Sequence, residues 1–198
     1  NGYLMSDTPL TLAETASVFS EMLAFRVLLD STDNPENRRF LLAGKVEDML
    51  NTVVRQIAFH NFETVFHDAR RKGEVSAEQL SDIWMDTQSS ALGPGVNLDD
   101  SYRSVWAYIP HFVHSPFYVY AYAFGDCLVN ALWQSYQNSS AEKRPQFVSD
   151  YRGLLAAGGT VRYDSGLRPF GLDATKPEFW HLGLDMVASM IDELESLS

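Results

Sequence analysis

The stretch Ile109–Leu128, IPHFVHSPFYVYAYAFGDCL, combines imidazoles, phenols and one acid within an otherwise apolar run. Its polar rings are those of His111, His114, Tyr118, Tyr120 and Tyr122. A buried tyrosine must place its hydroxyl against a polar partner, a requirement that leucine or valine does not have. Two interpretations follow. Either these hydroxyls and imidazoles gather at a cleft, or an amphiphilic aromatic helix carries the hydroxyls at its surface.

The spacing within this stretch favours a bend followed by a helix. A proline at each end of residues 110–116 prevents regular helix throughout that segment, and we expect a helix over Phe117–Tyr136. Tyr118 and Tyr122 are four residues apart and share one face of such a helix, whereas Tyr120 points elsewhere. Two phenols beside an imidazole can donate hydrogen bonds to a developing oxyanion, which makes this face a candidate catalytic surface.

The rest of the chain shows helical spacing of its apolar residues, and alternating patterns typical of strands are brief. Capping residues, prolines in first turns and glycines beyond last turns mark the expected helix ends. Ser76 and Gln79, for example, have the spacing of a capping box. We expect helices over residues 11–29, 35–72 (one long helix, or two joined near Ala43-Gly44), 76–90, 141–157 and 175–197, with one or two helical turns over 102–108. The sequence therefore predicts an all-α fold, with residues 1–198 as a single multi-helix domain.

Composition narrows the classes of partner. The 198 residues carry a formal charge of −11, which disfavours binding to nucleic acid and to anionic lipid. The apolar run 117–133 is interrupted by Gly125, Asp126 and Asn130, so we interpret it as a buried helix rather than a membrane span. Cys127 is the sole cysteine, which fits a reducing, cytoplasmic location and a small core residue better than a nucleophile.

Two acids lie seven residues apart, and hence on one face, of the first expected helix. Glu14 has the spacing to complete a capping box with Thr11, and its alternative role is that of a metal ligand. Glu21 follows two helical turns later. Two acids on one otherwise apolar face need a cation or a histidine to offset the cost of their desolvation.

A second candidate group is formed by His60, Glu63 and His67, which have helical spacing. An H-x-x-E pattern on a helix can hold a metal. The charged residues that follow at 68–72, DARRK, favour the other interpretation, an ordinary solvated helix surface.

Three stretches resemble the C-terminal part of oligoendopeptidase F, a zinc metallopeptidase of the thimet oligopeptidase family. They are SDTPLTLAETASVFSEML (Ser6–Leu23), IPHFVHSPFYVYAYAFGDCL (Ile109–Leu128) and GLDATKPEFWHLGLDMVASMIDELESL (Gly171–Leu197). The resemblance implies that Glu14 is a zinc ligand and that Glu21 orients a zinc-bound histidine from a second shell.

The resemblance also implies roles for the aromatic stretch. His111, Tyr118 and Tyr122 would lie over the scissile carbonyl of a short peptide substrate, with Tyr120 as an alternative to either tyrosine. The H-E-x-x-H motif of the family, which supplies two zinc histidines and the general base, does not occur in these 198 residues. We therefore expect a portion of a larger zinc peptidase that is inactive alone and that self-associates through apolar surface. The alternatives are a helical peptide-binding module without catalysis and a purely structural piece.

Overall fold

The computed structural model describes residue 12 and residues 15–197. Every regular element in these residues is an α-helix or a 3-10 helix, so the prediction of an all-α fold is confirmed. No helix in the described part is long and apolar enough to cross a membrane.

The described chain forms two compact units. Unit 1 consists of Asn1–Met49 and Phe124–Ser198, and unit 2 consists of Leu50–Ala123. Two compact units can belong to one folding domain, so the single domain expected from the sequence stays a prediction.

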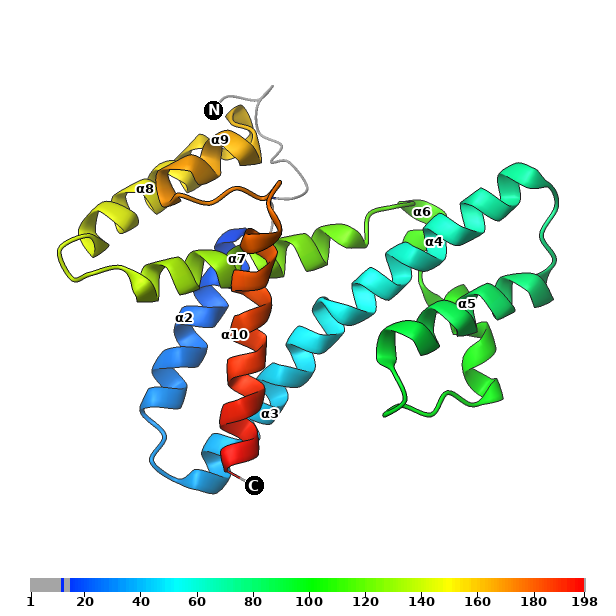
Figure 1. The fold of residues 1–198 in the computed structure, drawn as a ribbon, viewed down its shortest axis with the longest axis horizontal. Helices are drawn as coiled ribbons and strands as arrows, with labels where there is room; N and C mark the ends of the chain where they lie inside the picture. Colours follow the sequence, from blue (N-terminus) through cyan, green and yellow to red (C-terminus); the bar gives the residue numbers. More distant parts are fainter. Residues whose placement is uncertain (1–11, 13–14, 198) are drawn as a thin grey trace. The chain divides into compact units, whose positions relative to one another are not determined.

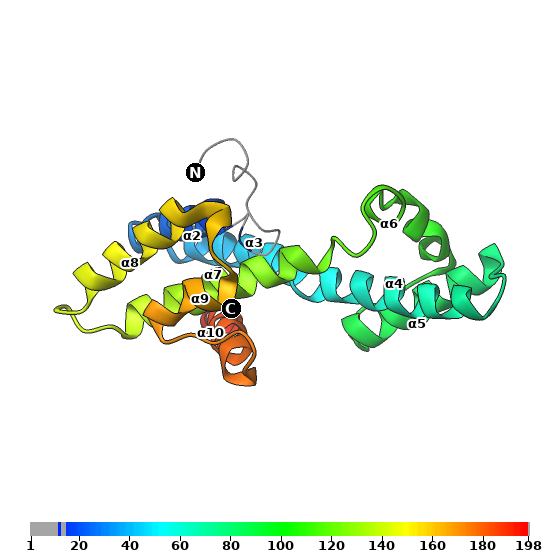
Figure 2. The ribbon, with the colours of Figure 1, turned by 90° about the horizontal axis from the view of Figure 1, so that it is seen from above.

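Unit 1 is built around one buried helix. Its helices are α2 (Thr15–Asp30), most of α3 (Pro35–Thr52), most of α7 (Tyr120–Asn138), α8 (Arg144–Ala157), α9 (Tyr163–Leu167) and α10 (Pro177–Ser196), with short 3-10 turns η3 (Gly158–Thr160) and η4 (Arg168–Phe170). The ribbon views show α7 passing between the other helices of this unit (Figure 1 and Figure 2). Residues 125–133 of α7 are all buried, as expected of a helix that is covered on every side.

Aromatic contacts and one close backbone approach join α7 to its neighbours. Phe124 packs edge-on against Trp180 of α10, with ring centroids 5.2 Å apart. A Cβ at Gly183 of α10 would lie only 2.9 Å from the backbone oxygen of Cys127, so glycine lets the two helices meet. Burial raises the pKa of the Cys127 thiol to about 12, which agrees with a small core residue.

Unit 2 packs α4 (Val54–Lys72) side by side with α5 (Ala77–Leu92) (Figure 1). It continues through the 3-10 segment η2 (Asp100–Tyr108) and the single turn α6 (His111–His114) into the start of α7. Trp84 is fully buried at the centre, 5.2 Å from the ring of Phe62, and its indole N–H donates to the carbonyl oxygen of Tyr102 at 2.9 Å. The predicted capping box of Ser76 and Gln79 is present at the start of α5.

Several expected helix boundaries differ from those of the structure. The long helix over 35–72 divides at Val53 rather than near Ala43-Gly44, and α3 runs through Gly44 without interruption. A helical glycine costs about 1 kcal/mol relative to alanine, and burial of Leu42, Val46 and Met49 on the same helix outweighs that cost. The helix expected from Phe117 begins instead at Tyr120.

Candidate active site

The structure brings together three of the residues predicted to be catalytic. The Nε2 atom of His111 lies 3.3 Å from the hydroxyl oxygen of Tyr122. The ring of Tyr118 stacks on His111 with centroids 5.5 Å apart and lies 5.4 Å from the ring of Tyr122. All three side chains are half-buried, so they combine a fixed geometry with access from solvent.

Local chain geometry explains why these rings meet. Pro110 precedes the single helical turn α6, where its fixed φ suits a helix start, so residues 110–116 contain one helical turn and a bend. Phe117 then adopts a φ of 61°, in the left-handed region. Tyr118 therefore lies before α7 rather than on it. The two phenols meet as expected, but a bend positions Tyr118 where we had expected a shared helix face.

Tyr120 does not join this cluster. Its ring lies 5.7 Å from the ring of His60, edge to face, and its side chain is exposed. His114, at the end of α6, is also exposed. Of the three tyrosines that the sequence left as candidates, the structure thus places Tyr118 and Tyr122 beside His111.

Glu63 is the residue that sequence reasoning misjudged. It is only 1% exposed, so the expectation of a solvated surface around His60 and His67 is wrong at this position. One carboxylate oxygen accepts a hydrogen bond from the backbone N–H of Phe117 at 2.8 Å. Burial raises the pKa of Glu63, while the Phe117 N–H and the nearby His60, His67 and His111 oppose that shift. A signal was present in the sequence, because Glu63 has the helical phase of Phe59 and Phe66.

The acids of the first helix have different outcomes. Glu14 lies outside the described residues, so its predicted role as a zinc ligand stays a prediction. Glu21 is mostly exposed, and its carboxylate accepts from the buried Lys45 ammonium at 2.5 Å. Burial raises the pKa of Asp126, and the positive charge of Lys45 opposes that rise. Lys45 is thus the cation beside Glu21, and the expectation for the pair Glu14 and Glu21 stays a prediction.

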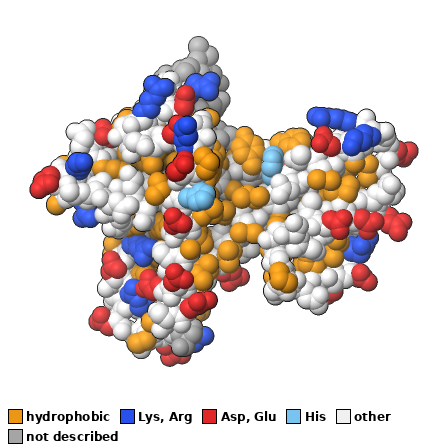
Figure 3. All heavy atoms as spheres, in the orientation of Figure 1, with side chains coloured by type: hydrophobic (Ala, Val, Ile, Leu, Met, Phe, Trp, Pro, Cys, Tyr) orange, Lys and Arg blue, Asp and Glu red, His pale blue; other side chains and the backbone are white. Residues whose placement is uncertain are grey.

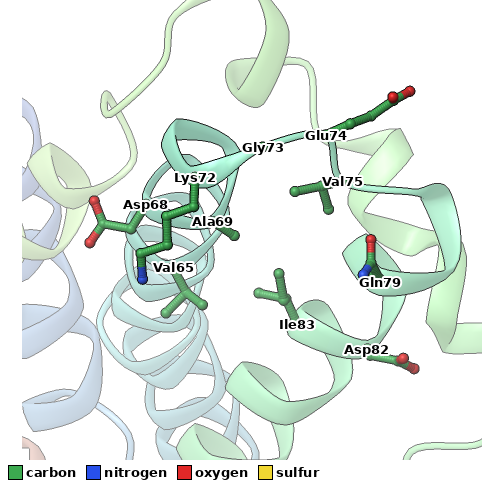
Figure 4. A pocket seen from close by; sticks show the side chains of 10 residues that line it. All are labelled: Val65, Asp68, Ala69, Lys72, Gly73, Glu74, Val75, Gln79, Asp82 and Ile83. Atoms are coloured by element: carbon green, nitrogen blue, oxygen red, sulfur yellow. The ribbon is translucent and has the colours of Figure 1, made fainter.

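Unit 2 contains two pockets, and neither is lined by His111, Tyr118 or Tyr122. A pocket of about 730 Å³ at the α4–α5 turn is lined by residues such as Val65, Lys72 and Ile83, while Glu74 and Asp82 point away from it (Figure 4). It contains none of the predicted site residues. A smaller pocket of about 260 Å³ is lined mainly by apolar side chains, four of them aromatic, together with Glu63 and His67.

Comparison with known proteins identifies the family. The sequence profile of Peptidase family M3 matches residues 3–186. The chain belongs to peptidase family M3. It is 30% identical over 187 residues to oligopeptidase PepF of Bacillus subtilis, which covers 94% of this chain and 27% of that protein. It is 27% identical over 196 residues to an oligoendopeptidase F homologue of Lactococcus lactis, which covers 98% of this chain and 32% of that protein.

A solved M3-type structure has the same fold. The crystal structure of oligoendopeptidase-F from Enterococcus faecium superposes with a TM-score of 0.83 at 28% identity, over 96% of this chain and 36% of that one. The predicted resemblance to oligoendopeptidase F is confirmed. The chain spans about a third of the length of these relatives.

Peptidase family M3 consists generally of metallopeptidases, which need side chains arranged to hold a metal ion. Residues 12 and 15–197 contain no group of three or more histidine, cysteine, aspartate or glutamate side chains arranged to hold an ion. His60, Glu63 and His67 therefore do not form the metal site that their spacing allowed, since the Glu63 carboxylate faces the backbone of Phe117. A catalytic zinc site uses three protein ligands, and the described residues do not supply that set.

Proposed function

We propose that this chain forms part of the catalytic site of a zinc-dependent oligoendopeptidase that hydrolyses internal bonds of short peptides. The observation that carries the proposal is the contact of His111 with Tyr118 and Tyr122 in a member of a peptidase family. The proposal also places the enzyme in the cytoplasm, with neither nucleic acid nor membrane as a partner, in keeping with its net charge of −11.

In this proposal the hydroxyl of Tyr122 donates a hydrogen bond to the peptide carbonyl oxygen as negative charge develops there. His111 can support that donation only if its Nε2–H donates to the phenol oxygen, because an Nε2 lone pair would instead engage the hydroxyl proton. Stacking against Tyr118 fixes the orientation of the imidazole ring. One such donor typically contributes about 2.7–4 kcal/mol to the transition state.

The proposed metal is zinc, with Glu14 as the ligand from this chain. Glu21, two helical turns later, would orient a zinc-bound side chain from the second shell, and it already has a buried cation, Lys45, as its partner. The 198 residues contain no H-E-x-x-H motif, so the remaining donors and the general base must come from elsewhere. We therefore expect the chain alone to be inactive.

Substitution of Tyr122 tests the proposal in the complete enzyme that contains this chain. Tyr122→Phe removes one hydroxyl, and we expect kcat to fall by about 10²–10³-fold with little change in KM, because the lost hydrogen bond forms in the transition state. Cleavage of an internally quenched short peptide gives both constants. Tyr120→Phe is the matched control, since that exposed ring lies against His60 instead. An unchanged kcat in Tyr122→Phe would exclude Tyr122 as the oxyanion donor.

The alternative function is peptide binding without catalysis. The observation that favours it is the pocket of about 260 Å³ between α4, η2 and α6, whose lining includes Phe62, Phe66 and Phe112. A complete enzyme that binds the peptide but shows no cleavage with added zinc would support this alternative and reject the peptidase.

Self-association is the second proposed interaction. Hydrophobic side chains are exposed between charged ones on the face drawn in Figure 3. A groove between α2 and α3 is lined by Phe25, Leu28 and Leu41, and Phe40 beside them is 80% exposed. Apolar surface of this kind favours association. We expect Phe40→Glu to weaken it, and sedimentation that shows only monomer in the unsubstituted chain at high concentration would contradict the proposal.

A further inference from the structure

The bend between α6 and α7 determines whether the three catalytic candidates can meet. It covers residues 115–119, with His111 on the preceding turn and Tyr122 on the following helix. Phe117 in this bend is the one described residue other than glycine with a positive φ, 61°. A side chain in the left-handed region is strained, so the surrounding structure must hold it there.

Glu63 provides such a hold from α4. Its carboxylate accepts the Phe117 N–H at 2.8 Å, across 54 residues of sequence. The 1% exposure of Glu63 keeps water from competing for this hydrogen bond. The ring of His67, one helical turn after Glu63, lies 4.9 Å from the ring of Phe117 and contacts the same residue from a second position.

We infer that Glu63 is a positioning residue of the peptidase, which holds the bend at Phe117 so that Tyr118 and Tyr122 remain against His111. The inference rests on the proposed function, because its catalytic consequence requires these rings to act on substrate. Glu63 itself touches no reacting group. Its effect passes through the Phe117 amide to Tyr118, the next residue, and to the start of α7 three residues later.

The alternative to a positioning role is that Glu63 only fills space in the core of unit 2 and does not hold the bend. Its second carboxylate oxygen and the Nδ1 atom of His60 are both buried without a hydrogen-bond partner among the described residues. An incompletely paired acid is expensive to bury. If Glu63 only fills space, an apolar side chain of similar size should leave the bend unchanged. If Glu63 holds the bend, the same substitution should release it.

The experiment compares three substitutions in the complete enzyme. Glu63→Gln keeps an oxygen at the same reach and should preserve the bend. Glu63→Met fills the same space without an acceptor, and Glu63→Asp keeps the charge but draws the acceptor back by one methylene. The exposed Asp68 lies on the same helix beyond this contact, so Asp68→Asn is the matched control.

Two readouts are needed. The first is backbone amide exchange over residues 115–122, followed by mass spectrometry, which we expect to accelerate by about tenfold or more in Glu63→Met and Glu63→Asp and to stay unchanged in Glu63→Gln and Asp68→Asn. The second is peptide cleavage, where the first two variants should lose about tenfold in kcat with KM within about twofold, while the other two keep both constants. If Glu63→Met does not fold, the same comparison holds between Glu63→Asp and Glu63→Gln.

The outcomes distinguish failure of the inference from failure of the proposed function. Unchanged exchange in Glu63→Met and Glu63→Asp overturns the inference, whatever happens to activity. Faster exchange with unchanged kcat also overturns it, and the proposed function then stands or falls on Tyr122→Phe alone. If Glu63→Gln loses as much activity as Glu63→Met, the charge matters rather than the acceptor position, and the positioning role is rejected.

Discussion

Among the residues that the structure describes, each of the two units buries one carboxylate, and the two acids are compensated in different ways. Asp126 in α7 is 4% exposed and accepts from the side-chain amide of Asn130, one turn later on the same helix, at 2.9 Å. Lys45 of α3 supplies a nearby positive charge. Glu63 in α4 is also buried, but its hydrogen-bond donor is the backbone of a bend 54 residues away, and the groups that act electrostatically on it are three histidines.

The difference separates a structural acid from a positioning acid. Burial raises the pKa of both, so both cost folding free energy at neutral pH. The partners of Asp126 are side chains inside the packed helices of unit 1, so its removal changes stability and leaves the bend at Phe117 in place. Burial of Glu63 also lowers the free energy of unfolding, but its hydrogen-bond partner is the backbone of Phe117, and the next residue is Tyr118. Measurements of stability and of activity should therefore separate the two acids.

The largest stability effect is expected from Asp126→Asn. Burial raises the pKa of Asp126 to about 6, while Lys45 and Asn130 oppose the shift. A group whose pKa is higher in the folded state than in the unfolded state binds more protons when folded, so the free energy of unfolding falls as pH rises between about 4 and 6. Asparagine has no such cost. Since one pKa unit is about 1.4 kcal/mol, the variant should be more stable by up to about 3 kcal/mol at pH 7.

Urea denaturation between pH 4 and pH 8 measures this difference. The gain should be small near pH 4, where Asp126 is protonated in the folded state and only partly ionised in the unfolded state, and should approach its full size above pH 6. Asp185→Asn on the exposed face of α10 is the control and should show no such trend. Loss of stability in Asp126→Asn at pH 8 would mean that the favourable charge of the nearby Lys45 outweighs the cost of burial.

The two acids also show what the sequence could and could not predict. Local signals were sufficient for the helices, and Ser76 with Gln79 formed the expected capping box because its hydrogen bonds span only three residues. The helix break at Val53 was missed because a glycine nine residues earlier gave a stronger local signal. Glu63 was assigned to the surface because of the charged residues that follow at 68–72, although its helical phase matches that of Phe59 and Phe66. Nothing near it along the chain indicates a partner at Phe117.

The contact between Tyr118 and Tyr122 was predicted correctly, but the helical spacing on which that prediction rested is not its cause. Tyr118 and Tyr122 were paired through helical spacing, yet Tyr118 lies in a bend, and the left-handed Phe117 brings it to His111. No residue pattern for that backbone conformation exists in the sequence, because phenylalanine does not favour a positive φ. Glu14, which lies outside the described residues, was assigned its role by resemblance alone, and it stays a prediction.

The smallest stability effect is expected from Glu63→Gln, and its size tests the comparison most directly. Burial raises the pKa of Glu63, so the carboxylate also costs stability once pH rises above the ordinary glutamate range, and the sign matches that of Asp126. The Phe117 N–H and the histidines at 60, 67 and 111 oppose the shift and reduce the cost. Because glutamine retains an acceptor for the Phe117 amide, the variant should gain less than about 1 kcal/mol at pH 7. Measured over the same pH series, a gain larger than that of Asp126→Asn would show that Glu63 is the worse compensated acid, and the distinction between the two would then lose its energetic basis.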